Sequence, residues 1–162
     1  MRTSSAAQLE APRVENSRPL LIAGLRSRFG DEPWRGTPAL WQRFAPYLGK
    51  IHGQVGHTAY GLCFLSANSV EYLAGVEVSG RSGLPNDFTT VSIPAQRVLV
   101  FPHRDHVSKL HITCDMISEW LSTSGYEAAK PDGAPDFLER YSEEFNPSTG
   151  IGGMEVWVPI KA

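Results

Sequence analysis

The sequence predicts an α+β domain built from two β-α-β-β halves that are related by a pseudo-two-fold axis around a central cleft. The order strand, helix, strand, strand occurs twice along the chain, with amphipathic patterns for the helices and short apolar or alternating patterns for the strands. The segment Gly75-Val76-Glu77-Val78 also recurs as Gly153-Met154-Glu155-Val156, at an offset of 78 residues. Agreement between this repeat and the order of elements predicts an internal duplication.

The first half follows a polar lead-in, residues 1–18, which we expect to be flexible, so that the folded domain spans residues 19–162. Residues 20–25 form an apolar run that predicts a buried strand. A helix comes next, with Thr37 as its N-cap and Pro38 at its first position. The apolar face of this helix contains Leu40, Trp41, Phe44, Tyr47 and Leu48.

Two strands complete the first half, over residues 60–65 and 71–78. The segment 80–87, rich in Gly, Ser, Pro and Asn, predicts a loop between the halves, which cover approximately residues 19–79 and 94–162.

The second half repeats the same order of elements. We expect a strand over residues 97–103, a helix over 107–121, a strand or short helix over 136–141 and a closing strand over 154–160. A glycine-rich turn, residues 146–153, precedes the closing strand.

Composition narrows the class of protein. Of the 162 residues, 41% are hydrophobic and 20% charged, with a formal net charge of −2, so we expect no basic surface and no direct nucleic-acid binding. The stretch 115–144 is acidic and is interpreted as a solvated face. Cys63 and Cys114 are expected to be buried free thiols. Because neither a signal peptide nor a membrane span is recognisable, we expect a cytoplasmic protein without membrane contact.

Several segments, in order and together covering nearly all of residues 19–162, resemble the GyrI-like small-molecule-binding family, whose domains also form the effector-binding halves of AraC- and MerR-type transcription regulators. The segments that carry the resemblance are residues 40–44, 60–61, 72–78, 100–104, 120–121, 138–141 and 155–160. The resemblance implies a duplicated β-α-β-β fold with an aromatic ligand cleft and a buried glutamate that holds lipophilic cations. By position, Glu155 matches that glutamate, whereas Val98 departs from the family by replacing an expected tyrosine. Residues 1–18 are too few to form a helix-turn-helix.

The candidate ligand-binding residues follow from the duplication and the resemblance. Glu155 is the first choice, and Glu77 is its equivalent in the other half. Aromatic side chains bind cations and flat molecules, so we expect the cleft to be lined by Trp41, Trp120, Tyr60 and Tyr141. For each of these residues the alternative is an ordinary role, in the core for the aromatics and on a solvated strand face for the glutamates.

No metal or cofactor is expected. The cluster His103, Asp105, His106 and His111 matches no established zinc spacing, and Asp105 is more simply the N-cap of the second helix. No G-x-S-x-G motif supports a serine nucleophile.

Three functional hypotheses remain open. The first is a stand-alone small-molecule-binding protein that senses or sequesters lipophilic cationic or neutral compounds. The second, implied by hydrolases in the same family, is an enzyme that opens strained electrophilic rings, with Glu155 activating water and Tyr141 positioning the substrate. The third is a module that modulates DNA gyrase, with the acidic stretch mimicking nucleic-acid charge.

Overall fold

The computed structural model describes residues 9–30 and 32–161, and within them the chain forms an eight-stranded antiparallel sheet and two α-helices. The strands are β1 (Arg13–Asn16), β2 (Leu20–Phe29), β3 (Gln54–Leu65), β4 (Val70–Val78), β5 (Thr89–Ile93), β6 (Arg97–His103), β7 (Phe137–Tyr141) and β8 (Met154–Ile160). The helices are α1 (Thr37–Phe44) and α2 (Leu110–Ser122), with the 3-10 turns η2 (Pro33–Arg35), η3 (Ala45–Tyr47) and η4 (Val107–Lys109). The predicted α+β class is therefore confirmed. Neither α-helix of the described part is long and apolar enough to cross a bilayer.

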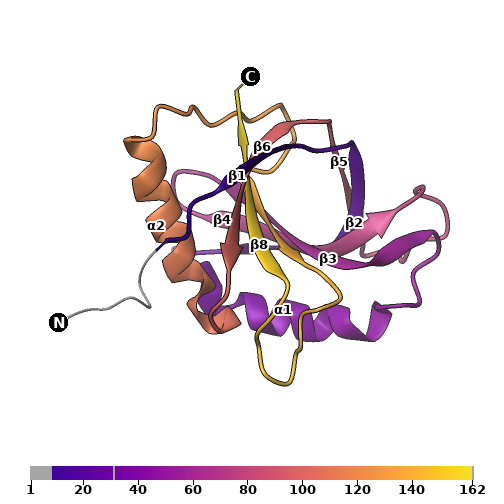
Figure 1. The fold of residues 1–162 in the computed structure, drawn as a ribbon. Coiled ribbons are helices and arrows are strands. Elements are labelled where there is room, and N and C mark those ends of the chain that lie inside the picture. The colour runs from indigo at the N-terminus through magenta and orange to yellow at the C-terminus, as the bar shows by residue number, and fades with distance from the viewer. Residues whose placement is uncertain (1–8, 31, 162) are drawn as a thin grey trace.

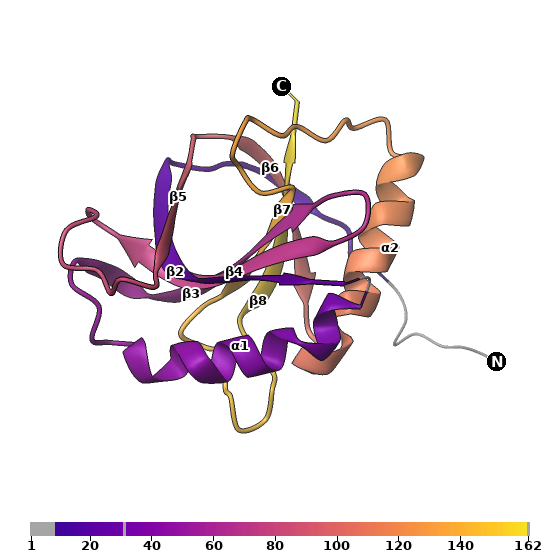
Figure 2. The ribbon, with the colours of Figure 1, turned by 180° about the vertical axis from the view of Figure 1, so that it is seen from behind.

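The order of strands forces the sheet to curl. Across the sheet the order is β1-β6-β8-β7-β3-β4-β2-β5, so β1 and β2 lie near opposite edges although only residues 17–19 separate them along the chain. Strands β5 and β6 also lie near opposite edges of the sheet, and only residues 94–96 connect them. The two crossings meet where the Ser17 amide donates to the Gln96 carbonyl oxygen at 2.7 Å. Figures 1 and 2 show the resulting ring of strands, with both helices outside it.

Both helices cover the same side of the sheet, which we call the helix face. Leu40 and Phe44 of α1 pack with residues of β2, β3 and β4, whereas Leu110 and Ile117 of α2 pack with residues of β6, β7 and β8. Trp41 contacts both groups. The opposite, concave face has its own apolar filling, formed by Leu20, Ile22, Tyr60, Leu62, Phe64, Leu73, Val91, Ile93 and Leu138.

Most predicted elements are confirmed, with corrections at four places. The edge strand β1 lies in the segment expected to be a flexible lead-in, and β5 was not expected. Thr37 is the first residue of α1 rather than its N-cap, which is Gly36. The side chain that caps η4 belongs to His106, which accepts a hydrogen bond from the Ser108 amide, and not to Asp105.

The strand order also bears on the predicted duplication. The three strands β6-β8-β7 and the three strands β2-β4-β3 follow the same internal order, and they meet where β7 pairs with β3. A pseudo-two-fold axis between these two units stays a prediction.

The close approach of the paired strands β2 and β4 requires glycine at the position where Gly24 faces Gly75. Gly24 pairs with Gly75, and a Cβ atom added at Gly24 would overlap the carbonyl oxygen of Ala74, which is backbone and cannot rotate away. Gly24→Ala should therefore lower the free energy of unfolding by about 1–3 kcal/mol, the usual range for overpacking. Urea denaturation measures this loss. Gly30→Ala is the matched control, because nothing lies within 4 Å of its Cβ position; an equal loss in both variants would contradict the close approach.

Candidate functional site

The central strand β7 places a carboxylate in the middle of the helix face. Phe137, Glu139 and Tyr141 alternate along β7 and share the side on which the helices pack. Glu139 is paired in register with Gly61 of β3 and Val156 of β8, so it lies between the strands that support α1 and those that support α2. This position is the junction of the two helix-side cores.

Two tyrosine hydroxyls converge on one oxygen of this carboxylate. The Tyr72 hydroxyl donates to Glu139 Oε1 at 2.6 Å, and the Tyr141 hydroxyl donates to the same atom at 2.8 Å. Trp41 extends the chain of hydrogen bonds, because its indole Nε1 donates to the Tyr72 hydroxyl oxygen at 2.9 Å. Within the described residues no hydrogen bond reaches Oε2 of Glu139.

The charge of Glu139 is poorly compensated. Burial raises the pKa of Glu139, and the hydrogen bonds from Tyr72 and Tyr141 lower it by less, so that its pKa lies above the ordinary value. None of the described cationic side chains forms a salt bridge with it. Burial, followed by the charge of Glu139, raises the pKa of both tyrosines well above the usual range, so they remain hydroxyl donors.

Gly61 leaves the room that this arrangement needs. A Cβ atom at position 61 would overlap the Tyr72 hydroxyl and would lie 2.8 Å from Glu139 Oε1. The absence of a side chain at Gly61 therefore permits the hydrogen bond between these two groups.

Aromatic rings and two thiols surround the carboxylate. The Trp41 ring packs edge-on against Tyr72 and Tyr141, with centroid distances of 6.3 and 5.5 Å. Burial and the charge of Glu139 raise the pKa of Cys63 and of Cys114, which are free and remain protonated thiols. The site thus combines an acidic group with soft, polarisable surroundings.

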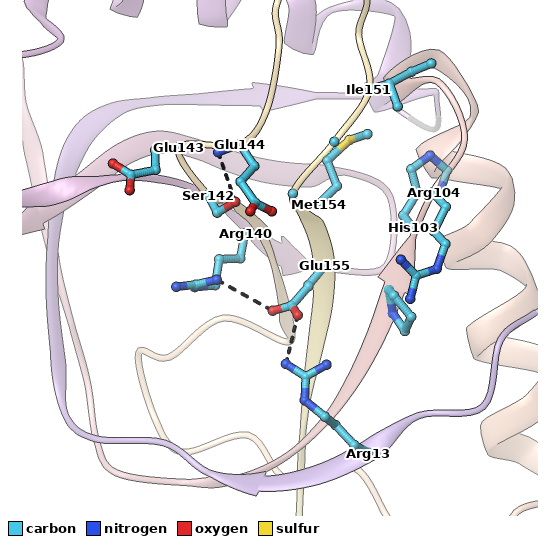
Figure 3. Close-up of a pocket in the computed structure, with 13 residues that line it drawn as sticks. Arg13, His103, Arg104, Arg140, Ser142, Glu143, Glu144, Ile151, Met154 and Glu155 are labelled. Atoms are coloured by element: carbon cyan, nitrogen blue, oxygen red, sulfur yellow. Dashed lines mark hydrogen bonds and ion pairs between the residues drawn. The ribbon is translucent and has the colours of Figure 1, made fainter.

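Glu155, the glutamate chosen from the sequence, lies on the concave face and is already paired. Arg13 Nη2 donates to its Oε2 at 2.8 Å, and Arg140 Nη1 lies 3.7 Å from Oε1 (Figure 3). Trp157 Nε1 also donates to Oε1, at 3.0 Å. Burial raises the pKa of Glu155, but the hydrogen bonds from Trp157 and Arg13 and the arginine charges outweigh it, so the pKa is lowered. Glu155 therefore has internal partners in this structure, and its role as a ligand-binding residue stays a prediction.

The other predicted residues are divided between the two faces. Trp41 and Tyr141 contact the Glu139 cluster directly. Trp120 packs on the helix face at the far end of α2, against Phe101 and Tyr126.

On the concave face, Tyr60 belongs to the apolar filling. Glu77 forms a two-pronged ion pair with Arg18, at 2.5 and 2.7 Å. The proposed catalytic pair is also separated, since Tyr141 pairs in register with Met154 on the helix face whereas Glu155 pairs with Arg140 on the other.

Glu139 and Tyr72 are not among the site residues predicted from the sequence. The frequency of acids in residues 115–144 predicts a solvated face, and this prediction is wrong for Glu139, whose carboxylate accepts hydrogen bonds from Tyr72 and Tyr141 on the helix face. A signal was present in the alternation of Phe137, Glu139 and Tyr141, which places a carboxylate on the same side of the strand as two aromatic residues.

The histidines have structural contacts. His103 is buried, with Nδ1 2.7 Å from the Thr113 hydroxyl and Nε2 2.9 Å from the His106 carbonyl oxygen. The His111 ring stacks on Trp34, with a centroid distance of 4.5 Å. These contacts hold η4 and the start of α2 against the sheet and against η2.

Two substitutions should change the pH dependence of stability in opposite directions. Because folding raises the pKa of Glu139, its contribution is present below the unfolded pKa and is lost as the pH rises through the folded pKa. From about pH 4 towards pH 7, Glu139→Gln should therefore gain unfolding free energy relative to the wild type. Folding lowers the pKa of Glu155, whose contribution is present above the unfolded pKa and is lost as the pH falls, so Glu155→Gln should lose stability relative to the wild type as the pH rises.

Urea unfolding at a series of pH values measures both differences. Parallel differences for the two variants would contradict the assignment of the raised carboxyl pKa to position 139.

Comparison with known proteins identifies the family and supports the fold. The GyrI-like small molecule binding domain family matches residues 10–161. The transcriptional regulator BrlR of Pseudomonas aeruginosa is 29% identical over 136 residues, which are 82% of this chain and 49% of BrlR, so the chain spans about half the length of that relative.

Two solved structures share the fold. SAV2435 bound to tetraphenylphosphonium superposes with a TM-score of 0.72 at 15% identity, over 94% of this chain and 95% of that one. A putative transcription regulation protein from Staphylococcus aureus MU50 has a TM-score of 0.67 at 18% identity, over 93% and 98%. With its family match over residues 10–161, the chain belongs to the GyrI-like small molecule binding domain family.

Proposed function

We propose that the chain binds small lipophilic cations on the helix face, with Glu139 as the charge partner and with Trp41, Tyr72 and Tyr141 as the aromatic wall. The observation that carries this proposal is the partly buried carboxylate of Glu139, which among the described residues has hydroxyl partners but no cationic one. Neutral lipophilic compounds would use the same wall without the charge pairing.

The physical reason is the cost of the buried charge. An ionised carboxylate away from water is unfavourable unless a cation or several hydrogen bonds compensate it. The two hydroxyls bind Oε1, which leaves Oε2 available to an incoming positive charge. A large organic cation loses little hydration when it enters such a site, and aromatic rings attract cations through their electron-rich faces.

Entry of a ligand would require Trp41 to move. Its indole both bonds to Tyr72 and contacts the cores under α1 and α2, so it packs from α1 beside the tyrosines that bind the carboxylate. Displacement of this side chain would couple occupancy of the site to the position of α1. Such coupling suits a domain that senses a compound as well as one that sequesters it.

The relatives support this choice of ligand and role. One protein of the same fold is bound to tetraphenylphosphonium, and BrlR is a transcriptional regulator. We extend both properties to this chain as part of the proposal, with the β6-β8-β7 and β2-β4-β3 units as pseudo-two-fold halves and the Glu139 site at their junction.

Tetraphenylphosphonium binding, measured by isothermal titration calorimetry between about pH 4 and pH 8, tests the proposal. Only the ionised form of Glu139 attracts the cation, so the affinity should rise with pH through the raised pKa of Glu139 and then level off. Glu139→Gln should weaken binding by about tenfold or more at the upper pH, equivalent to one pKa unit of interaction, and should remove the pH dependence.

Glu155→Gln and Glu77→Gln are the matched controls, and both should bind as the wild type does. Triphenylphosphine oxide, a neutral probe of similar shape, should bind equally to the wild type and Glu139→Gln. Loss of tetraphenylphosphonium binding in Glu155→Gln, with Glu139→Gln unaffected, would instead assign the ligand carboxylate to the residue chosen from the sequence.

A further inference from the structure

A polar cavity of about 600 Å³ opens on the other side of β7 from Glu139. It lies where β6 and β7 end and β8 begins, and β1 supplies Arg13 to its wall (Figure 3). This volume lies within the range of small-molecule sites, about 300–1,000 Å³. Charged residues dominate the lining, with Arg104 and Arg140 among the bases and Glu143 and Glu144 among the acids.

Arg140 is the incompletely paired cation of this cavity. Glu155 already accepts hydrogen bonds from Arg13 and Trp157, and the nearest nitrogen of Arg140 is 3.7 Å from it, beyond hydrogen-bonding distance. The guanidinium lies 5.6 Å from the centre of the Trp157 ring, and its side chain is 30% exposed. Within the described residues no hydrogen bond from the Arg140 side chain occupies its N–H donors.

The neighbouring charges restrict what Arg140 can bind. Arg104 is neutralised by Glu10, with contacts of 2.7 and 3.0 Å, and Arg13 is shared between Glu15 and Glu155. Because its pKa is lowered, Glu155 stays ionised near neutral pH. With Glu143 and Glu144 also in the lining, a ligand with several negative charges would be repelled.

Apolar contacts complete the site. The Met154 side chain packs in the helix-side core, so the apolar contacts are Ile151, 46% exposed and part of the lining, and the Trp157 ring, which lies beside Arg140. A molecule with one anionic group and a small apolar body could therefore bind Arg140 through the group and these side chains through the body.

We propose that this cavity is a second ligand site, selective for small organic monocarboxylates held by the guanidinium of Arg140. The planar guanidinium matches a carboxylate with two parallel hydrogen bonds. The site is distinct from the proposed cation site, because adjacent residues of β7, Glu139 and Arg140, point to opposite faces of the sheet.

Benzoate is the probe, and the indole N–H signal of Trp157 in a two-dimensional NMR spectrum is the readout, because this group bonds to Glu155. The signal should shift saturably with benzoate while the signal of Trp41 does not. Arg140→Gln should weaken benzoate binding by about tenfold or more, the loss expected for hydrogen bonds to a charged group. Arg97→Gln, which removes an exposed arginine outside the cavity, should bind as the wild type does.

The variant Glu155→Gln distinguishes an Arg140 that binds a ligand from an Arg140 that serves only as an ion-pair partner of Glu155. Removing this internal carboxylate should strengthen benzoate binding by about two- to fivefold, the size of a partly exposed charge interaction. Unchanged spectra with benzoate, or an affinity that is the same in Arg140→Gln as in the wild type, would overturn the proposal. Unaltered indole signals of Trp34, Trp41 and Trp120 in Arg140→Gln establish that this variant is folded. The variant Arg140→Lys keeps the positive charge but not the planar guanidinium, so it should bind benzoate with intermediate affinity.

Discussion

The helix side of the molecule is organised around the hydrogen bonds between Glu139 and the hydroxyls of Tyr72 and Tyr141. Three strands supply the groups that this arrangement needs, because Tyr72 comes from β4, Glu139 and Tyr141 come from β7, and β3 between them contributes only the space at Gly61. A buried carboxylate without these donors would be far more costly. With them it is tolerated, but none of the described cationic side chains pairs with it.

The curled sheet explains how one small domain presents two different chemical environments. Short crossings at residues 17–19 and 94–96 bring the sheet edges together, so one face is outside, under α1 and α2, and the other is inside. Along β7 the alternation of side chains then separates charges by face. Glu139 faces aromatic rings and thiols, whereas Arg140 faces Glu155 and water.

Much of this fold could be predicted from the sequence, because its central elements have strong patterns. The bounds of β6 and β8 agree with the expected strands, since buried apolar residues recur along both. Strand β1 could not be recognised in the same way, because Arg13–Asn16 is polar and is ordered by pairing with β6 rather than by its own apolar residues.

The site was harder to predict than the fold for a related reason. A repeat of four residues predicts that Glu77 and Glu155 are equivalent. In the structure both are carboxylates on the concave face, and each forms an ion pair with an arginine from residues 13–18. The repeat therefore identified an electrostatic feature of the scaffold. Glu139 has no such arginine, and this lack of a partner, which depends on contacts between distant strands, is what makes it the better candidate for an external cation.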